Sequence, residues 1–137
     1  METSTFKLDK DIEVFCVRAK SFPDGVMQAH QTLHALVPPS NIRKYFGISR
    51  PEGGKGIIYR AAMDELSSGE LSAHKLEKFL IKSGNYICID IPDFMKNPIL
   101  IGQSFQQLLK DPGIDPQGAC IEWYLNPNDC KCMVKLK

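Results

Sequence analysis

The last twenty residues, "GACIEWYLNPNDCKCMVKLK" from Gly118 to Lys137, contain the pattern that decides the fold. Two apolar runs flank the turn sequence "NPND", which is typical of an antiparallel hairpin. Glu122 stands in the middle of the first run. Because successive side chains of a strand point to opposite faces, Glu122 and Tyr124 share one face and Trp123 lies on the other. The face with Glu122 is therefore either solvated or the base of a site for a polar or cationic group.

The segments before this hairpin predict a strand and then a helix. "GNYICIDIP", over residues 84–92, has the composition of a strand. "NPILIGQSFQQLLKDPG", over residues 97–113, begins with Asn97 as a capping residue and Pro98 in the first turn, and its apolar residues recur at helical spacing. Residues 84–137 therefore have the predicted order β-α-β-β.

The first half of the chain repeats that order. It contains a strand over residues 11–20, an amphipathic helix within residues 21–39, and two strands over residues 43–51 and 56–65 that are joined by the turn-rich "EGGKG". Two such halves, with one helix each, would be stabilised by packing into one molecule. We therefore expect an α+β fold made of tandem β-α-β-β repeats, with an antiparallel sheet and a central ligand groove.

Two segments fall outside the repeated order. Residues 1–10 are polar and are expected to form a tail that precedes a single domain over residues 11–137. "SSGELSAHKLEKFLIKSG", over residues 67–84, has leucine and phenylalanine at helical spacing, so its pattern alone predicts a helix.

The overall charge argues against nucleic acid as a direct partner. Seventeen Lys and Arg residues against sixteen Asp and Glu residues give a formal net charge of +1, so there is no global basic field for phosphates. The start of the chain lacks an apolar run of signal-peptide length, and no stretch approaches the roughly 20 apolar residues that span a bilayer. We therefore expect a cytoplasmic protein that does not contact membranes.

The cysteines and histidines form no complete metal-binding motif. The five cysteines lie in or beside apolar runs, which is typical of buried free thiols, and Cys130 and Cys132 lack a second pair at ligand spacing. His30 and His34 have the spacing of two ligands on one helical face, but no third ligand accompanies them in sequence. The flank of a helix is the favoured interpretation, pocket lining and metal binding are the alternatives, and no cofactor is expected.

Tyrosines are placed where they could surround Glu122. Tyr45, Tyr59, Tyr86 and Tyr124 fall on four different predicted strands, two in each half. Ring faces and a carboxylate together attract lipophilic cations. Tyrosine is also a common strand residue with an amphipathic edge, so a structural role is the alternative for each of them.

These features resemble the GyrI-like effector-binding family. The likeness is carried by the order of elements, the closing hairpin with its apolar-Glu-x-Tyr strand, and the Gly-x-Tyr of "SGNYICIDI", and it extends from about Asp11 to Lys137. The family includes the small-molecule-binding domains of AraC-type and MerR-type transcription regulators, multidrug binding among their roles, and gyrase inhibitory proteins. The resemblance implies two SHS2-like β-α-β-β modules with a groove between them, and an extended "LEKFLIK".

The resemblance also implies which residues bind the ligand. Glu122 matches the glutamate at the base of the groove, on the next-to-last strand, and Tyr124 matches the aromatic residue two positions later. Tyr86 falls in the Gly-x-Tyr position, and Tyr59 in the third strand of the first module. About ten residues before the first strand cannot hold a helix-turn-helix, so a free-standing effector-binding protein is expected.

Three functions are alternatives at this point. The leading one is a binding protein that holds a hydrophobic molecule with a cationic or polar tip, linked to transcription regulation or toxin resistance. The second is a hydrolase of reactive, cyclopropane-containing molecules in which Glu122 orients or deprotonates water. The third is a protein-interaction or gyrase-modulating role, with the acidic residues 111–129, which include no Lys or Arg, as its surface. A separate regulator or a second copy of the chain would be the protein partner.

Overall fold

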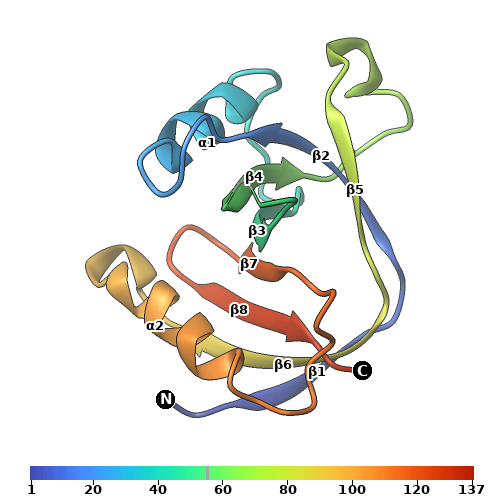
Figure 1. Ribbon diagram of the computed structural model, residues 1–137. Coiled ribbons are helices and arrows are strands. Elements are labelled where there is room, and N and C mark those ends of the chain that lie inside the picture. Colours follow the sequence, from blue (N-terminus) through green and yellow to red (C-terminus); the bar gives the residue numbers. More distant parts are fainter. Residues whose placement is uncertain (55) are drawn as a thin grey trace. The chain divides into compact units, whose positions relative to one another are not determined.

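A computed structural model describes residues 1–54 and 56–137 as an α+β protein with antiparallel strands (Figure 1). Lys55, in the predicted "EGGKG" turn, lies outside the described residues. The elements are β1 (Ser4–Leu8), β2 (Ile12–Arg18), α1 (Val26–His34), β3 (Tyr45–Pro51), β4 (Ile57–Met63), η1 (Ser72–His74), β5 (Glu77–Ile81), β6 (Gly84–Ile91), η2 (Phe94–Lys96), α2 (Ile99–Leu108), β7 (Cys120–Tyr124) and β8 (Cys130–Lys135). The predicted α+β class and antiparallel pairing are confirmed.

The chain folds as two compact units. The terminal unit consists of Met1–Asp11 and Lys82–Lys137, and the middle unit consists of Ile12–Ile81. Neighbouring strands follow the order β1-β6-β8-β7 in the terminal unit and β3-β4-β2-β5 in the middle unit. Each unit therefore contains the order β-α-β-β, with one further strand beside the first strand of that order. That the units are copies of one SHS2-like module with a groove between them stays a prediction.

In the middle unit, α1 covers one face of the sheet because its apolar side chains recur at helical spacing. Ala29 and Leu33 are buried there and pack with Phe15 and Met63, which lie opposite each other on β2 and β4. Burial of a side chain such as Leu33 is worth roughly 1.5–3 kcal/mol. A shift of β4 by one residue would move Met63 to the other face, so this packing fixes the register.

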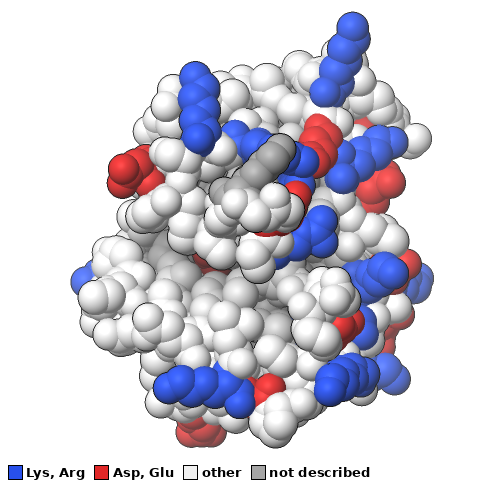
Figure 2. Space-filling view, in the orientation of Figure 1, with Lys and Arg blue, Asp and Glu red and all other residues white. Residues whose placement is uncertain are grey.

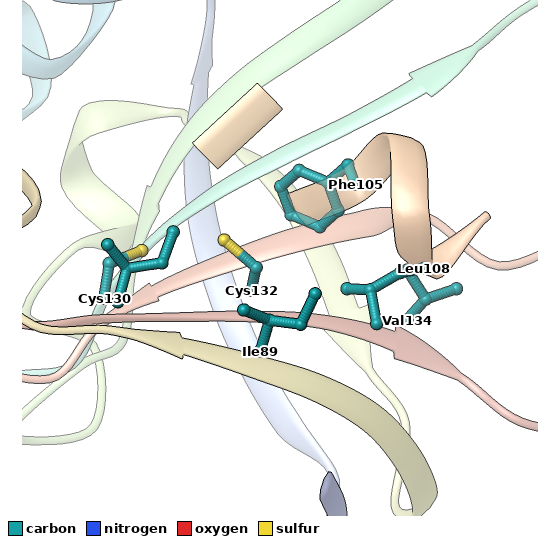
Figure 3. Close-up of a cluster of buried hydrophobic side chains, with 7 residues drawn as sticks. Ile89, Phe105, Leu108, Cys130, Cys132 and Val134 are labelled. Carbon is teal, nitrogen blue, oxygen red and sulfur yellow. The ribbon is translucent and has the colours of Figure 1, made fainter. Parts of the chain in front are cut away.

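In the terminal unit, α2 covers the sheet in the same way. Phe105 and Leu108 pack on Ile89, Cys132 and Val134 (Figure 3). Ile89 and Cys132 lie opposite each other on β6 and β8. Every second residue of these strands therefore faces α2, which defines the helix side of the terminal unit.

The first ten residues do not form the expected tail. Ser4–Leu8 is strand β1 and pairs antiparallel with β6. Phe6 is half-buried and Leu8 is buried. A strand of five residues with two apolar side chains is too short to be told from a polar tail by its pattern. This segment is a strand because it pairs with β6, which is distant in sequence.

Within residues 67–84 the part "LEKFLIK" is extended, as the resemblance implied, and the helix predicted by the pattern alone is wrong. Glu77–Ile81 forms β5 and pairs with β2, with Phe79 opposite Val14. Only Ser72–His74 forms a short 3-10 helix. Pairing with an existing strand satisfies the backbone of β5 and overrides the weak helical spacing.

Arg60 is a buried arginine that links the strands of the middle unit. It is 2% exposed, and its guanidinium donates hydrogen bonds to the carboxylates of Glu77, at 3.0 and 3.2 Å, and of Glu52. Hydrogen bonds from Arg60 lower the pKa of Glu52 to about 2. Those from Arg18, and then from Arg60, lower the pKa of Glu77 to about 2. Because both folded-state pKa values lie below the ordinary 4.5, these pairs stabilise the fold above about pH 4.5 and lose their effect as the pH falls towards 2.

Arg60→Met should therefore destabilise the protein at neutral pH, by about 1–3 kcal/mol, because two carboxylates lose a shared cation while their partial exposure lets water compensate in part. The penalty should shrink at about pH 3, where the unfolded carboxyls already bind protons. Urea unfolding at both pH values measures it. Lys44→Met, which removes a partly exposed pair with Asp64 at 3.5 Å, is the control and should cost less than ~1 kcal/mol. An Arg60→Met penalty that does not change with pH would contradict the assignment.

Candidate functional site

Glu122 is a buried carboxylate in the middle of a strand. It is 8% exposed and lies on β7 opposite Cys132 of β8. Cys132 belongs to the apolar cluster under α2, so Glu122 lies on the helix side of the terminal unit. A carboxylate in such a place is costly unless hydrogen-bond donors or a cation meet it.

Tyr124 supplies one such donor. Its hydroxyl donates a hydrogen bond to Oε1 of Glu122, because the two side chains are two residues apart on β7 and share a face. The ring of Tyr124 lies 5.5 Å from that of Phe94, centroid to centroid. The N–H of Phe94 donates to the carbonyl of Asn128, at 2.9 Å, which ties η2 to the closing turn of the hairpin. We call Glu122, Tyr124 and Phe94 the carboxylate site.

Phe94 is a member of this site that sequence reasoning did not find. It lies in η2, between the strand and the helix predicted for this half. Its sequence neighbours show no alternating or helical pattern, and it is brought to the hairpin by the hydrogen bond of its N–H to Asn128 and that of the Asp93 N–H to Asp129. The available signal was an aromatic residue in the short connection between the predicted strand and the predicted helix.

Trp123 lies on the opposite face of β7, as alternation predicted. It is half-buried, and its ring meets that of Phe6 edge-on with centroids 5.9 Å apart. Its cross-strand neighbour Lys131 places Nζ 5.1 Å from the centroid of the same Phe6 ring. Trp123 thus helps to hold β1 on the sheet and is not part of the carboxylate site.

Tyr86 does not lie beside Glu122. It pairs with Lys135 of β8, which is three residues from Cys132, so alternation puts Tyr86 on the face opposite to Glu122. Tyr86 is 1% exposed, and its hydroxyl donates to the carbonyl of Lys82 at 2.6 Å. Burial, with Asp11 as a smaller cause, raises the pKa of Tyr86 to about 12. Tyr86 thus lies apart from the carboxylate site, and its predicted role in ligand binding stays a prediction.

Tyr59 belongs to the middle unit, on the face covered by α1. It is 1% exposed and its hydroxyl is 2.8 Å from Nε2 of His30. Phe22 stacks on its ring, with centroids 5.9 Å apart. Tyr45, on β3 of the same unit, meets His34 at 4.7 Å between centroids. The terminal unit thus brings Glu122 and Tyr124 together, and the predicted role of Tyr59 in ligand binding stays a prediction.

The five cysteines are free thiols. Burial raises the pKa of Cys16 to about 12 and those of Cys88 and Cys120 to about 11. A side-chain hydrogen bond with Cys132, and then burial, raise the pKa of Cys130. A thiol with a raised pKa is protonated at neutral pH and is a poor nucleophile.

Alkylation of the native protein should therefore be slow. At about pH 7.5 iodoacetamide should modify Cys120, the one cysteine that is half-buried, before the four buried ones, and all five should react promptly in urea. Intact-mass spectrometry over time measures the number of adducts, and peptide mapping identifies the first. Rapid modification of Cys130 in the native state would contradict the expected order.

Charged side chains of both signs lie on the face of the molecule that is drawn in Figure 2. Figure 2 shows acidic side chains among the basic ones on the face in view, in keeping with the formal net charge of +1. No helix within residues 1–54 and 56–137 is long and apolar enough to cross a membrane.

Comparison with known proteins identifies the fold. No protein-family model matches this sequence, and no curated protein is significantly similar to it. Among solved structures, an integron cassette protein from the mobile metagenome of Vibrio cholerae matches with a TM-score of 0.68 and 16% sequence identity, over 98% of this chain and 95% of that one.

Two proteins of Listeria innocua are also similar. One is described as a hydrolase and matches with a TM-score of 0.59 and 10% identity, over 99% of this chain and 92% of that one. The other is an uncharacterised conserved protein with a TM-score of 0.55 and 12% identity, over 99% and 91% of the two chains. At such identities the matches show a shared fold, which is compatible with a GyrI-like fold.

Replacement of Tyr124 tests the hydrogen bond at the centre of the carboxylate site. Tyr124→Phe should lower the free energy of unfolding by about 1–3 kcal/mol at neutral pH, because Glu122 loses a donor while it stays buried. In the Glu122→Gln background the same change should cost less, since an amide is less expensive to bury than a carboxylate. Urea unfolding of the four proteins gives the coupling energy. If Tyr124→Phe lowered the free energy of unfolding equally in wild type and in Glu122→Gln, the hydrogen bond between Tyr124 and Glu122 would not contribute to stability.

Proposed function

We propose that the protein binds a small hydrophobic molecule with a cationic or polar tip, and that Glu122 holds this tip. The proposal rests above all on one observation. Glu122 is buried beside the apolar cluster under α2, and Tyr124 donates a hydrogen bond to it.

The surroundings of Glu122 are suited to the binding of a cation. Removal of a carboxylate from water costs several kcal/mol, and the hydrogen bond from Tyr124 offsets about 1.5–3 kcal/mol of that cost. A ligand cation beside Glu122 would be attracted strongly because the apolar surroundings screen charge weakly. The neighbouring rings of Tyr124 and Phe94 would each add about 0.5–2 kcal/mol if the cation lay over a ring face.

The finer form of the proposal is a free-standing, GyrI-like effector-binding protein. The apolar-Glu-x-Tyr strand and the Gly-x-Tyr segment support it, and the shared fold is compatible with it. In this form the protein acts in the cytoplasm without direct contact to nucleic acid, in multidrug binding tied to transcription regulation or toxin resistance, together with a separate regulator or a second copy. Tyr59 belongs to the proposed ligand residues, whereas the position of Tyr86 on the face opposite to Glu122 weighs against direct contact.

Hydrolysis is the second candidate, and the bond between Glu122 and Tyr124 favours it. A carboxylate can orient or deprotonate a water, and a phenol can stabilise developing negative charge by donating a hydrogen bond. One of the similar structures is described as a hydrolase. Cyclopropane-containing electrophiles would be the substrates to try first, with product formation followed by mass spectrometry.

A matched pair of ligands tests the proposal. A thermal-shift screen of aromatic quaternary ammonium ions should find compounds that raise the melting temperature, because they bind the folded state only. For the best of them, isothermal titration should show that Glu122→Gln weakens binding by about 1–3 kcal/mol, the scale of a desolvated charge-assisted contact. The neutral analogue with carbon in place of nitrogen should bind wild type and Glu122→Gln alike.

Glu13→Gln is the matched control for the change in net charge. Glu13 is an exposed strand residue of β2, so its replacement should leave both affinities within about 0.5 kcal/mol of wild type. If wild type and Glu122→Gln bound the cation with equal affinity, Glu122 would not be a ligand-binding residue. If Glu13→Gln lost as much cation affinity as Glu122→Gln, the loss in Glu122→Gln would be an effect of net charge and not of a contact with the ligand.

A further inference from the structure

The connection between β6 and α2 is attached to the closing turn of the hairpin by two consecutive main-chain N–H groups. The N–H of Phe94 donates to the carbonyl of Asn128 at 2.9 Å, and the N–H of Asp93 donates to Oδ1 of Asp129 at 3.3 Å. Over residues 92–98 every residue is exposed except Phe94, which is half-buried. The ring of Phe94 and these two hydrogen bonds therefore anchor the connection on the sheet.

Asp129 uses both oxygens of its carboxylate in this attachment. Oδ1 accepts the hydrogen bond from Asp93, and Oδ2 accepts one from Nδ2 of Asn126 at 3.1 Å. Oδ1 of Asn126 in turn accepts the N–H groups of Asn128 and Asp129, at 2.8 and 2.9 Å. The turn thus fixes the carboxylate of Asp129 and directs one of its oxygens to the connection. A hydrogen bond to a charged acceptor is stronger than one between neutral groups.

The backbone of Asp93 needs such support. Its φ is 50°, in the left-handed region that residues other than glycine adopt less readily. In this conformation Asp93 and Phe94 both direct their N–H groups to the turn. The ring of Phe94 then lies 5.5 Å from that of Tyr124, between centroids, at an angle of 40°. Loss of the bond from Asp129 would free Asp93 to change conformation and Phe94 to leave Tyr124.

The ring of Phe94 matters more for some cations than for others. A primary ammonium ion is strongly hydrated and donates N–H hydrogen bonds directly to a carboxylate. A quaternary ammonium ion has no N–H to donate, and aromatic ring faces attract it. Removal of one ring from beside Glu122 and Tyr124 should therefore weaken the binding of a quaternary ion more than that of a primary ion.

We propose that Asp129 is a positioning residue of the carboxylate site, which holds Phe94 beside Tyr124 and thereby gives the site a preference for quaternary over primary ammonium ions. The inference rests on the proposed binding of a cation at Glu122. In this role Asp129 acts through the main chain of Asp93 and does not touch the ligand. What it supplies is an acceptor oxygen at a fixed place, so asparagine should replace it better than alanine.

Two ligands that share a benzyl group test the proposal on the full chain. In isothermal titration at pH 7, wild type should bind benzyltrimethylammonium more tightly than benzylamine, which is then a primary ammonium ion. Asp129→Ala should weaken the binding of benzyltrimethylammonium by about threefold to tenfold and that of benzylamine by less than about twofold. Asp129→Asn should keep most of the wild-type preference. Without any ligand, the nuclear Overhauser effects between the rings of Phe94 and Tyr124 should weaken in Asp129→Ala.

Asp115→Ala is the matched control, because Asp115 also accepts a main-chain hydrogen bond in a loop of the terminal unit, from the N–H of Gln117 at 2.9 Å. This variant should bind both ions like wild type. An unchanged preference in Asp129→Ala, or unchanged ring contacts, would overturn the proposal. A wild type that does not prefer benzyltrimethylammonium would overturn it too, as would equal losses in Asp115→Ala and Asp129→Ala.

Failure of the proposed function has a different signature. If Glu122→Gln bound both ions like wild type, the cation would not lie at Glu122, whatever the result for Asp129. If Glu122→Gln weakened both ions while Asp129→Ala kept the wild-type preference, only the positioning role of Asp129 would be wrong.

Discussion

The burial of a carboxylate on an apolar strand face is the constraint on which the account of this protein depends. Glu122 sits opposite Cys132 in a hairpin whose other side chains on this face pack against α2. Such a group lowers stability unless it is compensated. The hydrogen bond from Tyr124 offsets part of this cost, and a cationic ligand would be attracted to Glu122 because the apolar surroundings screen charge weakly.

Rigid surroundings give the carboxylate site its geometry. Antiparallel pairing with β8 sets the position of Glu122, and packing of Phe105 and Leu108 of α2 fixes which face of the hairpin is covered. The backbone hydrogen bond from Phe94 to Asn128 then brings the ring of Phe94, which lies outside the strands, to the hairpin. Sites on paired strands hold their side chains more precisely than sites on loops. A preorganised carboxylate and two rings can therefore select for charge and shape without a large rearrangement on binding.

Local patterns predicted much of this structure, and long-range pairing explains the rest. Alternation within five residues was enough to put Glu122 with Tyr124 and to separate both from Trp123, because these relations are internal to one strand. The place of Tyr86 depends on the register of β6 against β8 and of β8 against β7, which a single strand does not encode. Strand β1 and the extended segment β5 depend in the same way on partners far along the chain.

For the two helices, prediction from the sequence was correct in kind and less exact in the bounds. Helical spacing predicted them within residues 21–39 and 97–113, and they occupy the shorter spans Val26–His34 and Ile99–Leu108. The contact of His30 with Tyr59 was outside the reach of sequence reasoning, because it joins a helix to a strand across the middle unit. The spacing of His30 and His34 on one helical face was visible, and the phenol beside them was not.

A crystal structure of the protein with the tightest-binding quaternary ammonium ion would test the central claim most directly. The account predicts the cationic nitrogen within about 4–5 Å of a carboxylate oxygen of Glu122 and within about 6 Å of the centroid of the Tyr124 or Phe94 ring. A cation bound at full occupancy elsewhere, with Glu122 and Tyr124 still joined and distant from it, would contradict the claim that Glu122 is the anchor of the site.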